Sequence, residues 1–181
     1  MAASRASGRR GDYARVVQPP RLRNSARALL LDADDRLLLA RHDLTARHIG
    51  SVIWAPPGGG LEVGETPLKA VVRELAEEVA LDVPIHGPLH VWHQQVISST
   101  YADGWDGAVF DYFLVRCDAS AVASASTQTL LQDEGITEFR WWTLDQLRDA
   151  SDGRLFRPRH LPELLGDLLT DSAARSYPIV I

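Results

Sequence analysis

Apolar residues in the first half of the chain repeat with the period of a helix in one segment. Leu68, Val71, Leu75 and Val79 follow one another at spacings of three or four residues, and Val72 widens the same stripe. Such a spacing places the side chains on one face of an α-helix. Immediately before this stripe, Thr66 and Pro67 provide an N-cap and a favoured first helical position. The pattern therefore predicts a helix that starts near residue 66 and buries one face.

Other apolar runs have the length and spacing of strands. The two runs in ARALLLDADDRLLLARH (26–42) are separated by Asp-Ala-Asp-Asp, which indicates a hairpin. Further strands are expected at 89–98, 107–117 and 136–142, with a turn-rich connection at 98–107 and a low-complexity loop at 118–135. Helices are expected to begin at Thr143 and near 160. Strands and helices mix without regular alternation, which favours an α+β sandwich.

Length and composition are those of one folded domain. The 181 residues, 45% of them hydrophobic, suffice for a core of ordinary size, and we expect a single domain over 25–181. Residues 1–24 are rich in Arg, Ala and Ser, which predicts a mobile arm. Arg-rich, acid-poor composition would also suit a nucleic-acid-binding arm or a targeting peptide, but no apolar face or interleaved aromatic residues accompany it.

Charge and cysteine content exclude several classes of protein. A net charge of −5 and a pI of about 5.6 argue against duplex nucleic acid or an anionic membrane as the main partner. A single cysteine, Cys117, allows neither an internal disulfide nor a cysteine-built zinc site. No apolar run reaches the roughly 18 residues of a membrane span. We therefore expect a cytoplasmic protein that acts on a small molecule.

Three glutamates crowd into one turn of the predicted helix. In RELAEEVAL (73–81), Glu74, Glu77 and Glu78 share a face because they are three and four residues apart. Mutual repulsion costs such pairs a few tenths of a kcal/mol, and a bound cation would remove that cost. Carboxylate oxygens without cysteine favour Mg²⁺ or Mn²⁺. EE and ExxE pairs also decorate many solvated helices, so the cluster gains weight only from the preceding loop, GGGLEVGE (58–65).

Loop and helix together resemble the sequence box of the Nudix (MutT-like) hydrolases. A Gly (Gly59), five residues, a Glu (Glu65), seven residues and then Arg-Glu-apolar-any-Glu-Glu from Arg73 match that box. One position departs from it, because Ala80 stands where the family has its last Gly. This substitution removes the residue best suited to a left-handed helix end, at an expected cost of about 1 kcal/mol. The resemblance covers roughly residues 25 to 155 and implies an α/β/α sandwich with a mixed sheet and a loop-helix-loop box.

The resemblance also implies an activity, a cofactor and a set of site residues. Nudix enzymes hydrolyse the diphosphate of a nucleoside diphosphate linked to another moiety, using metal-activated water. By resemblance, Mg²⁺ would be held by Glu74, Glu77 and Glu78, with the carbonyl of Gly58 as a further ligand, and Mn²⁺ could substitute. Arg73 and Glu65 would orient loop and helix through a salt bridge, with a phosphate contact by Arg73 as the alternative.

Members of the family often use an acidic residue outside the box as a ligand or general base. For that role we select Glu134, with Asp133 and Glu138 as the next candidates.

Aromatic residues and histidines have both functional and structural interpretations. Trp54 and Trp105 are candidates for stacking on a nucleobase, together with Trp92, although core or rim packing is the more common role of a tryptophan. His90 and His93 are three apart in a predicted strand, which places them on opposite faces and argues against a metal site.

Two other functions stay open at this stage. An isopentenyl-diphosphate isomerase of the same fold needs a cysteine acid, and Cys117 lacks the matching context. A nucleotide-sensing module would usually lose box glutamates, which this chain retains. The substrate can be ADP-ribose, a dinucleoside polyphosphate, an oxidised nucleoside triphosphate or a nucleotide sugar, and a homodimer is compatible with the family.

Overall fold

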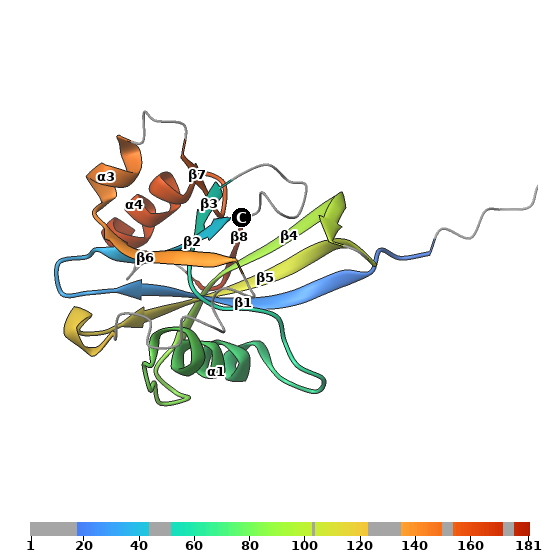
Figure 1. The fold of residues 1–181 in the computed structure, drawn as a ribbon, viewed down its shortest axis with the longest axis horizontal. Coiled ribbons are helices and arrows are strands. Elements are labelled where there is room, and N and C mark those ends of the chain that lie inside the picture. Colours follow the sequence, from blue (N-terminus) through green and yellow to red (C-terminus); the bar gives the residue numbers. More distant parts are fainter. Residues whose placement is uncertain (1–17, 44–51, 103, 123–134, 150–153, 172–175) are drawn as a thin grey trace, which may run out of the picture.

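The computed structural model describes residues 18–43, 52–102, 104–122, 135–149, 154–171 and 176–181. A mixed eight-stranded sheet runs through the molecule, with the helix α1 on one side and α3 and α4 on the other (Figure 1). The predicted α/β/α sandwich is thus confirmed. In chain order the elements are β1 (Leu22–Leu31), β2 (Leu37–Asp43), β3 (Val52–Ala55), α1 (Pro67–Val79), β4 (Leu89–Ala102), β5 (Trp105–Arg116), η2 (Ala119–Ala121), β6 (Ile136–Trp142), α3 (Leu144–Arg148), β7 (Leu155–Phe156), α4 (Leu161–Asp171) and β8 (Ile179–Val180).

The strand order places β1 near the centre of the sheet. Strands follow one another as β7-β3-β2-β1-β5-β4-β8, and β6 pairs with β2. β1 runs parallel to β5 along its whole length and antiparallel to β2 at its end. The second half of β1, from Ala26 to Leu31, is covered on both faces and is apolar except for Arg27.

Each face of the sheet contributes to its own hydrophobic cluster. Ala28 and Leu30 of β1 pack with the α1 residues Leu75 and Val79. Leu29 belongs to the opposite cluster, which includes residues of α4. Because neighbouring strand residues point to opposite faces, one apolar run serves both layers.

Most predicted elements are present, and two boundaries differ. The connection predicted at 98–107 is wrong, because β4 continues to Ala102 and β5 begins at Trp105, and these two residues pair. Gly104, with φ of 80°, makes the turn that permits so short a connection. β1 begins at Leu22, three residues before the predicted domain start, since Leu22 pairs with Gly107. Residues 1–17 of the predicted arm lie outside the described residues.

Within the described part of the chain, no helix combines the length and apolarity that crossing a bilayer requires.

Candidate functional site

The glycine-rich loop between β3 and α1 lies against the edge of β1 as an extension of the sheet. Ala26 donates its backbone N–H to the carbonyl of Gly59 at 2.9 Å, and Ala28 donates to Pro57 at 2.8 Å. At Gly58 the backbone has φ of 125°, and a Cβ there would lie 2.3 Å from the carbonyl oxygen of Ala26. Only glycine allows so close an approach of the two backbones. The loop is therefore fixed by the central strand.

The helix α1 places two of its glutamates against this loop. Glu74 and Glu78, four residues apart, are both buried, with 6% and 5% of their surface exposed. Glu78 Oε2 accepts a hydrogen bond of 2.7 Å from the backbone N–H of Gly58. A Cβ on Gly59 would lie only 2.4 Å from Glu74 Oε1, so the missing side chain provides the space for that carboxylate. Loop and helix therefore bring two buried carboxylates to one backbone turn.

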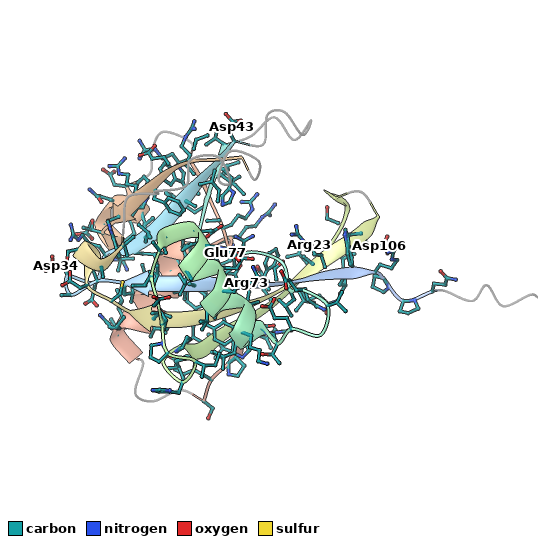
Figure 2. All side chains as sticks on the ribbon, turned by 60° about the horizontal axis from the view of Figure 1, so that its bottom comes forward. Arg23, Asp34, Asp43, Arg73, Glu77 and Asp106 are labelled. Carbon is teal, nitrogen blue, oxygen red and sulfur yellow. The ribbon has the colours of Figure 1, made fainter. Side chains whose placement is uncertain are left out.

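Arg73 connects the other acidic residues of the box. Its guanidinium forms two hydrogen bonds of 3.0 Å with the carboxylate of Glu65, and donates to Glu74 at 2.9 Å, to Glu77 at 3.0 Å and to the carbonyl of Gly60 at 3.1 Å. Arg73 and Glu77 lie together on α1 (Figure 2). These contacts bring Glu65, predicted from the sequence as its partner, together with the helix.

The same contacts shift the acid–base equilibria of the pair. The hydrogen bonds from Arg73 lower the pKa of Glu65 below its usual range. Conversely, hydrogen bonds to Glu65, followed by those to Glu74, raise the pKa of Arg73. Both groups are therefore charged at neutral pH, and the ion pair holds the end of the loop to the middle of α1. Glu77 is 54% exposed at its side chain and faces solvent beside them.

The end of α1 shows the consequence of the one departure from the family box. Ala80 caps the helix in the left-handed conformation, with φ of 53° and ψ of 34°. Leu81 donates its N–H to the carbonyl of Leu75, which closes the helix end. The chain thus makes the family's turn with an alanine, at the steric cost of its Cβ.

Sequence reasoning missed Arg27 of β1. Its guanidinium donates hydrogen bonds to the carbonyls of Gly58 and Pro56, the latter at 3.4 Å. The Gly58 carbonyl, a predicted metal ligand, thus has a cation beside it. One signal was available in the sequence, since Arg27 interrupts an otherwise apolar run.

The remaining predicted residues lie in different surroundings. Trp54 is only 5% exposed and packs edge-on against Trp142 with ring centroids 5.0 Å apart, a core position that favours packing over base stacking. Trp92 is also in the core. Trp105 is 37% exposed, with Arg21 above its ring, 5.5 Å from the ring centroid.

Glu134 and Asp133, predicted as acidic residues outside the box, lie outside the described residues, and Glu138 is exposed on β6.

The prediction for the two histidines of β4 is wrong. His90 and His93 lie on the same face, and each has a ring nitrogen within 3.0 Å of Asp111 Oδ1. A register shift in the β4–β5 ladder changes the alternation between them.

The donor set of the box suits a hard divalent cation. Glu74, Glu77 and Glu78 offer carboxylate oxygens, and the loop adds backbone carbonyls within one turn. Oxygen ligands with several negative charges are those that Mg²⁺ and Mn²⁺ prefer. The space that Gly59 leaves for Glu74 allows this carboxylate to stay close to the loop while it is buried. The residues present therefore fit such an ion.

Comparison with known proteins identifies the same family as the sequence box does. A sequence model described as NUDIX domain matches residues 21–164. An RNA pyrophosphohydrolase of Psychrobacter arcticus is 35% identical over 108 residues, covering 55% of this chain and 59% of that protein. An 8-oxo-dGTP diphosphatase of Proteus vulgaris is 40% identical over 58 residues, covering 32% of this chain and 50% of that protein. The chain thus matches less than two thirds of the length of these relatives.

Solved structures show the same fold at low sequence identity. A NUDIX hydrolase from Nitrosomonas europaea superposes with a TM-score of 0.61 at 20% identity, covering 87% of this chain and 93% of that one. A MutT protein from Methanosarcina mazei Go1 gives 0.60 at 16% identity, covering 87% and 99%. The arrangement of sheet, loop and helix is therefore shared with these proteins.

Proposed function

The chain belongs to the NUDIX domain family, and from this premise we propose that it hydrolyses, with Mg²⁺, the diphosphate bond of a nucleoside diphosphate linked to another moiety. One observation carries the proposal. The buried carboxylate of Glu78 accepts the N–H of Gly58, and that of Glu74 occupies the space that Gly59 leaves by having no side chain. Burying two carboxylates side by side is costly unless a cation compensates their charge. Part of that compensation comes from Arg73, which contacts Glu74.

The box residues divide into metal ligands and positioning residues in this reaction. Glu74, Glu77 and Glu78, with the carbonyl of Gly58, would hold Mg²⁺, and Mn²⁺ could replace it. When bound, the metal supplies charge neutralisation for the diphosphate and a water of lowered pKa. The N–H of Gly58 fixes one oxygen of Glu78, so this carboxylate keeps its orientation.

Arg73 and Glu65 act as positioning residues. Their ion pair holds the end of the loop to the middle of α1, so that carboxylates from the helix and carbonyls from the loop keep a constant separation. Because phosphoryl transfer depends mainly on the placement of charge, a rigid loop is a direct contribution to rate.

Arg27 extends the cationic part of the site. Its guanidinium contacts the loop carbonyls of Gly58 and Pro56, which are neutral acceptors. A phosphate oxygen arriving at the loop would be a stronger acceptor for the same donors. We therefore assign Arg27 to the binding of a substrate phosphate.

The substrate class follows from the relatives only in outline. Two of the relatives are named RNA pyrophosphohydrolase and 8-oxo-dGTP diphosphatase. The net charge of −5 does not favour a long nucleic acid. A small nucleotide, or the triphosphorylated end of a short oligonucleotide, therefore belongs in the first assay.

The test is a substrate panel with matched variants. Purified protein is incubated with Mg²⁺ and ADP-ribose, a dinucleoside tetraphosphate, 8-oxo-dGTP, a nucleotide sugar and a 5′-triphosphorylated oligoribonucleotide, and products are separated by chromatography. Glu78→Gln should abolish cleavage, whereas Glu163→Gln, an exposed change on α4, should not. Reaction in ¹⁸O-labelled water then shows which phosphorus is attacked.

Glu134 is proposed as the acidic residue outside the box. Glu134→Gln should lower turnover far more than Asp133→Asn. Equal and mild effects of the two changes would remove Glu134 from the site.

The same assay also tests the two other functions, a nucleotide sensor and an isomerase. A sensor would bind a nucleotide from the panel and release no product. An isomerase would need Cys117 near the box, yet the backbone N–H of Cys117 donates to the carbonyl of Leu31 at the far end of β1, while the loop bonds Ala26 and Ala28. Three to five residues of strand, about 10–16 Å, separate Leu31 from these loop contacts. Burial also raises the pKa of the Cys117 thiol.

A further inference from the structure

Two histidines and an aspartate gather on β4 and β5, outside the carboxylate box. His93 lies directly opposite Asp111 in the ladder, and its Nδ1 is 2.8 Å from Asp111 Oδ1. His90 places its Nε2 at 3.0 Å from the same oxygen. One ligand atom from each of the three side chains lies within 4.8 Å of the other two.

A β-bulge creates this grouping. In a regular strand, residues three apart point to opposite faces of the sheet. Here His90 is opposite Phe113 but Trp92 is opposite Tyr112, so β4 uses one more residue than β5 over this stretch. The extra residue reverses the alternation and turns His90 to the face of His93. Bulges often redirect a side chain in this way next to functional sites.

Packing holds the group in place. The ring of His90 stacks on Phe113 with centroids 4.8 Å apart and planes inclined by 23°. Its Nε2 is buried and, among the described residues, makes no hydrogen bond of normal geometry despite its closeness to Asp111. Asp111 itself is only 9% exposed. Nε2 of His90 is thus directed at the buried carboxylate of Asp111 and forms no regular hydrogen bond with it.

We propose that His90, His93 and Asp111 form a binding site for a divalent transition-metal ion, with Zn²⁺ favoured over Mg²⁺. Two imidazole nitrogens and one carboxylate oxygen are a donor set typical of zinc. Around a tetrahedral zinc ion, neighbouring donors are about 3.3 Å apart. The ring nitrogens of His93 and His90 lie 2.8 and 3.0 Å from Asp111 Oδ1, close to that value. No two of the three ligand atoms are more than 4.8 Å apart, so the most distant two have to approach each other by at most about 1.5 Å.

The site keeps one coordination position open. Side-chain exposures of 32% for His90 and 38% for His93 leave the outer side of the group in contact with solvent. Three protein ligands and a water are the arrangement of zinc sites that exchange their fourth ligand. The site would therefore admit a small anionic or neutral ligand from solvent.

This site lies on the same face of the sheet as α1, because Phe113, two residues from Asp111, belongs to the cluster of Leu75 and Val79, but it offers different donor atoms from the carboxylate box. Ala26 bonds the carbonyl of Gly59 on one side and pairs with Asp111 on the other. Two strand spacings, about 10 Å, therefore separate the Gly59 and Asp111 backbones. Nitrogen donors at one site and oxygen donors at the other would select different ions.

The experiment measures Zn²⁺ binding while Mg²⁺ occupies the box. Full-length protein without a histidine tag is stripped with a chelator and titrated with Zn²⁺ by calorimetry in excess Mg²⁺. We expect one Zn²⁺ per chain, and binding at least tenfold weaker in His93→Ala and in His90→Ala. His86→Ala changes an exposed histidine outside the group and should bind as the wild type does. Co²⁺ absorption spectra of the same proteins report nitrogen ligation.

A box variant separates the two sites. Zn²⁺ binding should persist in Glu78→Gln, because this residue is no ligand of the proposed site. Absence of Zn²⁺ binding by the wild type, or binding unchanged in folded His93→Ala, overturns the proposal, as does loss of binding in Glu78→Gln. Thermal melts establish that each variant is folded, and His90→Ala decides the question if His93→Ala does not fold.

Discussion

Replacing Arg73 by lysine tests whether one guanidinium holds the box together. Arg73 makes five hydrogen bonds, to Glu65, Glu74, Glu77 and Gly60, at 2.9 to 3.1 Å. Lysine keeps the charge but concentrates its donors at one point, so it cannot span a carboxylate on the loop and two on the helix. The change therefore removes geometry while it preserves net charge.

The expected loss follows from the contacts that lysine cannot make. About three of the five are lost, and each hydrogen bond to a charged group contributes about 1.5–3 kcal/mol in a buried setting. Arg73 is 24% exposed and Glu77 54%, so solvent screening reduces this sum. We expect the free energy of unfolding to fall by about 2–4 kcal/mol, and the melting temperature by about 4–16 °C for a chain of this length.

Urea unfolding followed by tryptophan fluorescence, with a chelator present, measures this difference. Arg116→Lys is the matched control, because Arg116 pairs with Asp35 where both side chains are at least half exposed. That change should stay within about 0.5 kcal/mol of the wild type. If Arg73→Lys costs no more than Arg116→Lys, the contacts of Arg73 do not hold loop and helix together. Saturating Mg²⁺ should narrow the deficit, because the ion would compensate the box carboxylates.

Three further changes probe the helix end, the loop and the first hairpin. Ala80→Gly should raise the free energy of unfolding by about 1 kcal/mol, because glycine adopts the left-handed conformation of this position without strain. Ala76→Gly, within the same helix, should lower the free energy of unfolding by about 0.5–1 kcal/mol. Urea unfolding measures both changes. Gly59→Ala should cut turnover about 10–100-fold with little effect on the melting temperature, since its Cβ would displace the carboxylate of Glu74; unchanged kinetics would contradict that contact. For Asp32, burial raises the pKa but hydrogen bonds within the β1–β2 turn outweigh it and lower the pKa below 3.8. Its contribution is complete above that pH and disappears as the pH falls through the lowered pKa, so the stability gap to Asp32→Asn should narrow in acid unfolding curves.

Local patterns in the sequence were sufficient to predict the box and its helix. Thr66 caps α1 and Pro67 starts it, as their types and positions indicate. The glutamate spacing places Glu74 and Glu78 on one face, and the contact between Glu65 and Arg73 follows the family box. These features depend on residues close in sequence, so they can be read without knowing the fold.

Features that depend on strand pairing could not be predicted from the sequence. The bulge that brings His90 and His93 together exists only against the register of β5. Arg27 reaches the carbonyl of Gly58 because a loop thirty residues later lies along its strand. The two-residue strands β7 and β8 have no apolar pattern long enough to detect and form only where β3 and β4 offer an edge.

The parallel pairing of β1 with β5 has a consequence for the order of folding. β1 is held along its length by a strand some eighty residues later, from Leu22 opposite Gly107 to Leu31 opposite Arg116. Such non-local pairing is slow to form, because closing a long loop costs entropy before any contact repays it. During synthesis the box emerges before β5, so its loop has no stable strand to lie against. We expect the capacity to bind metal to appear only after β5 has been made and paired, late in the maturation of the nascent chain.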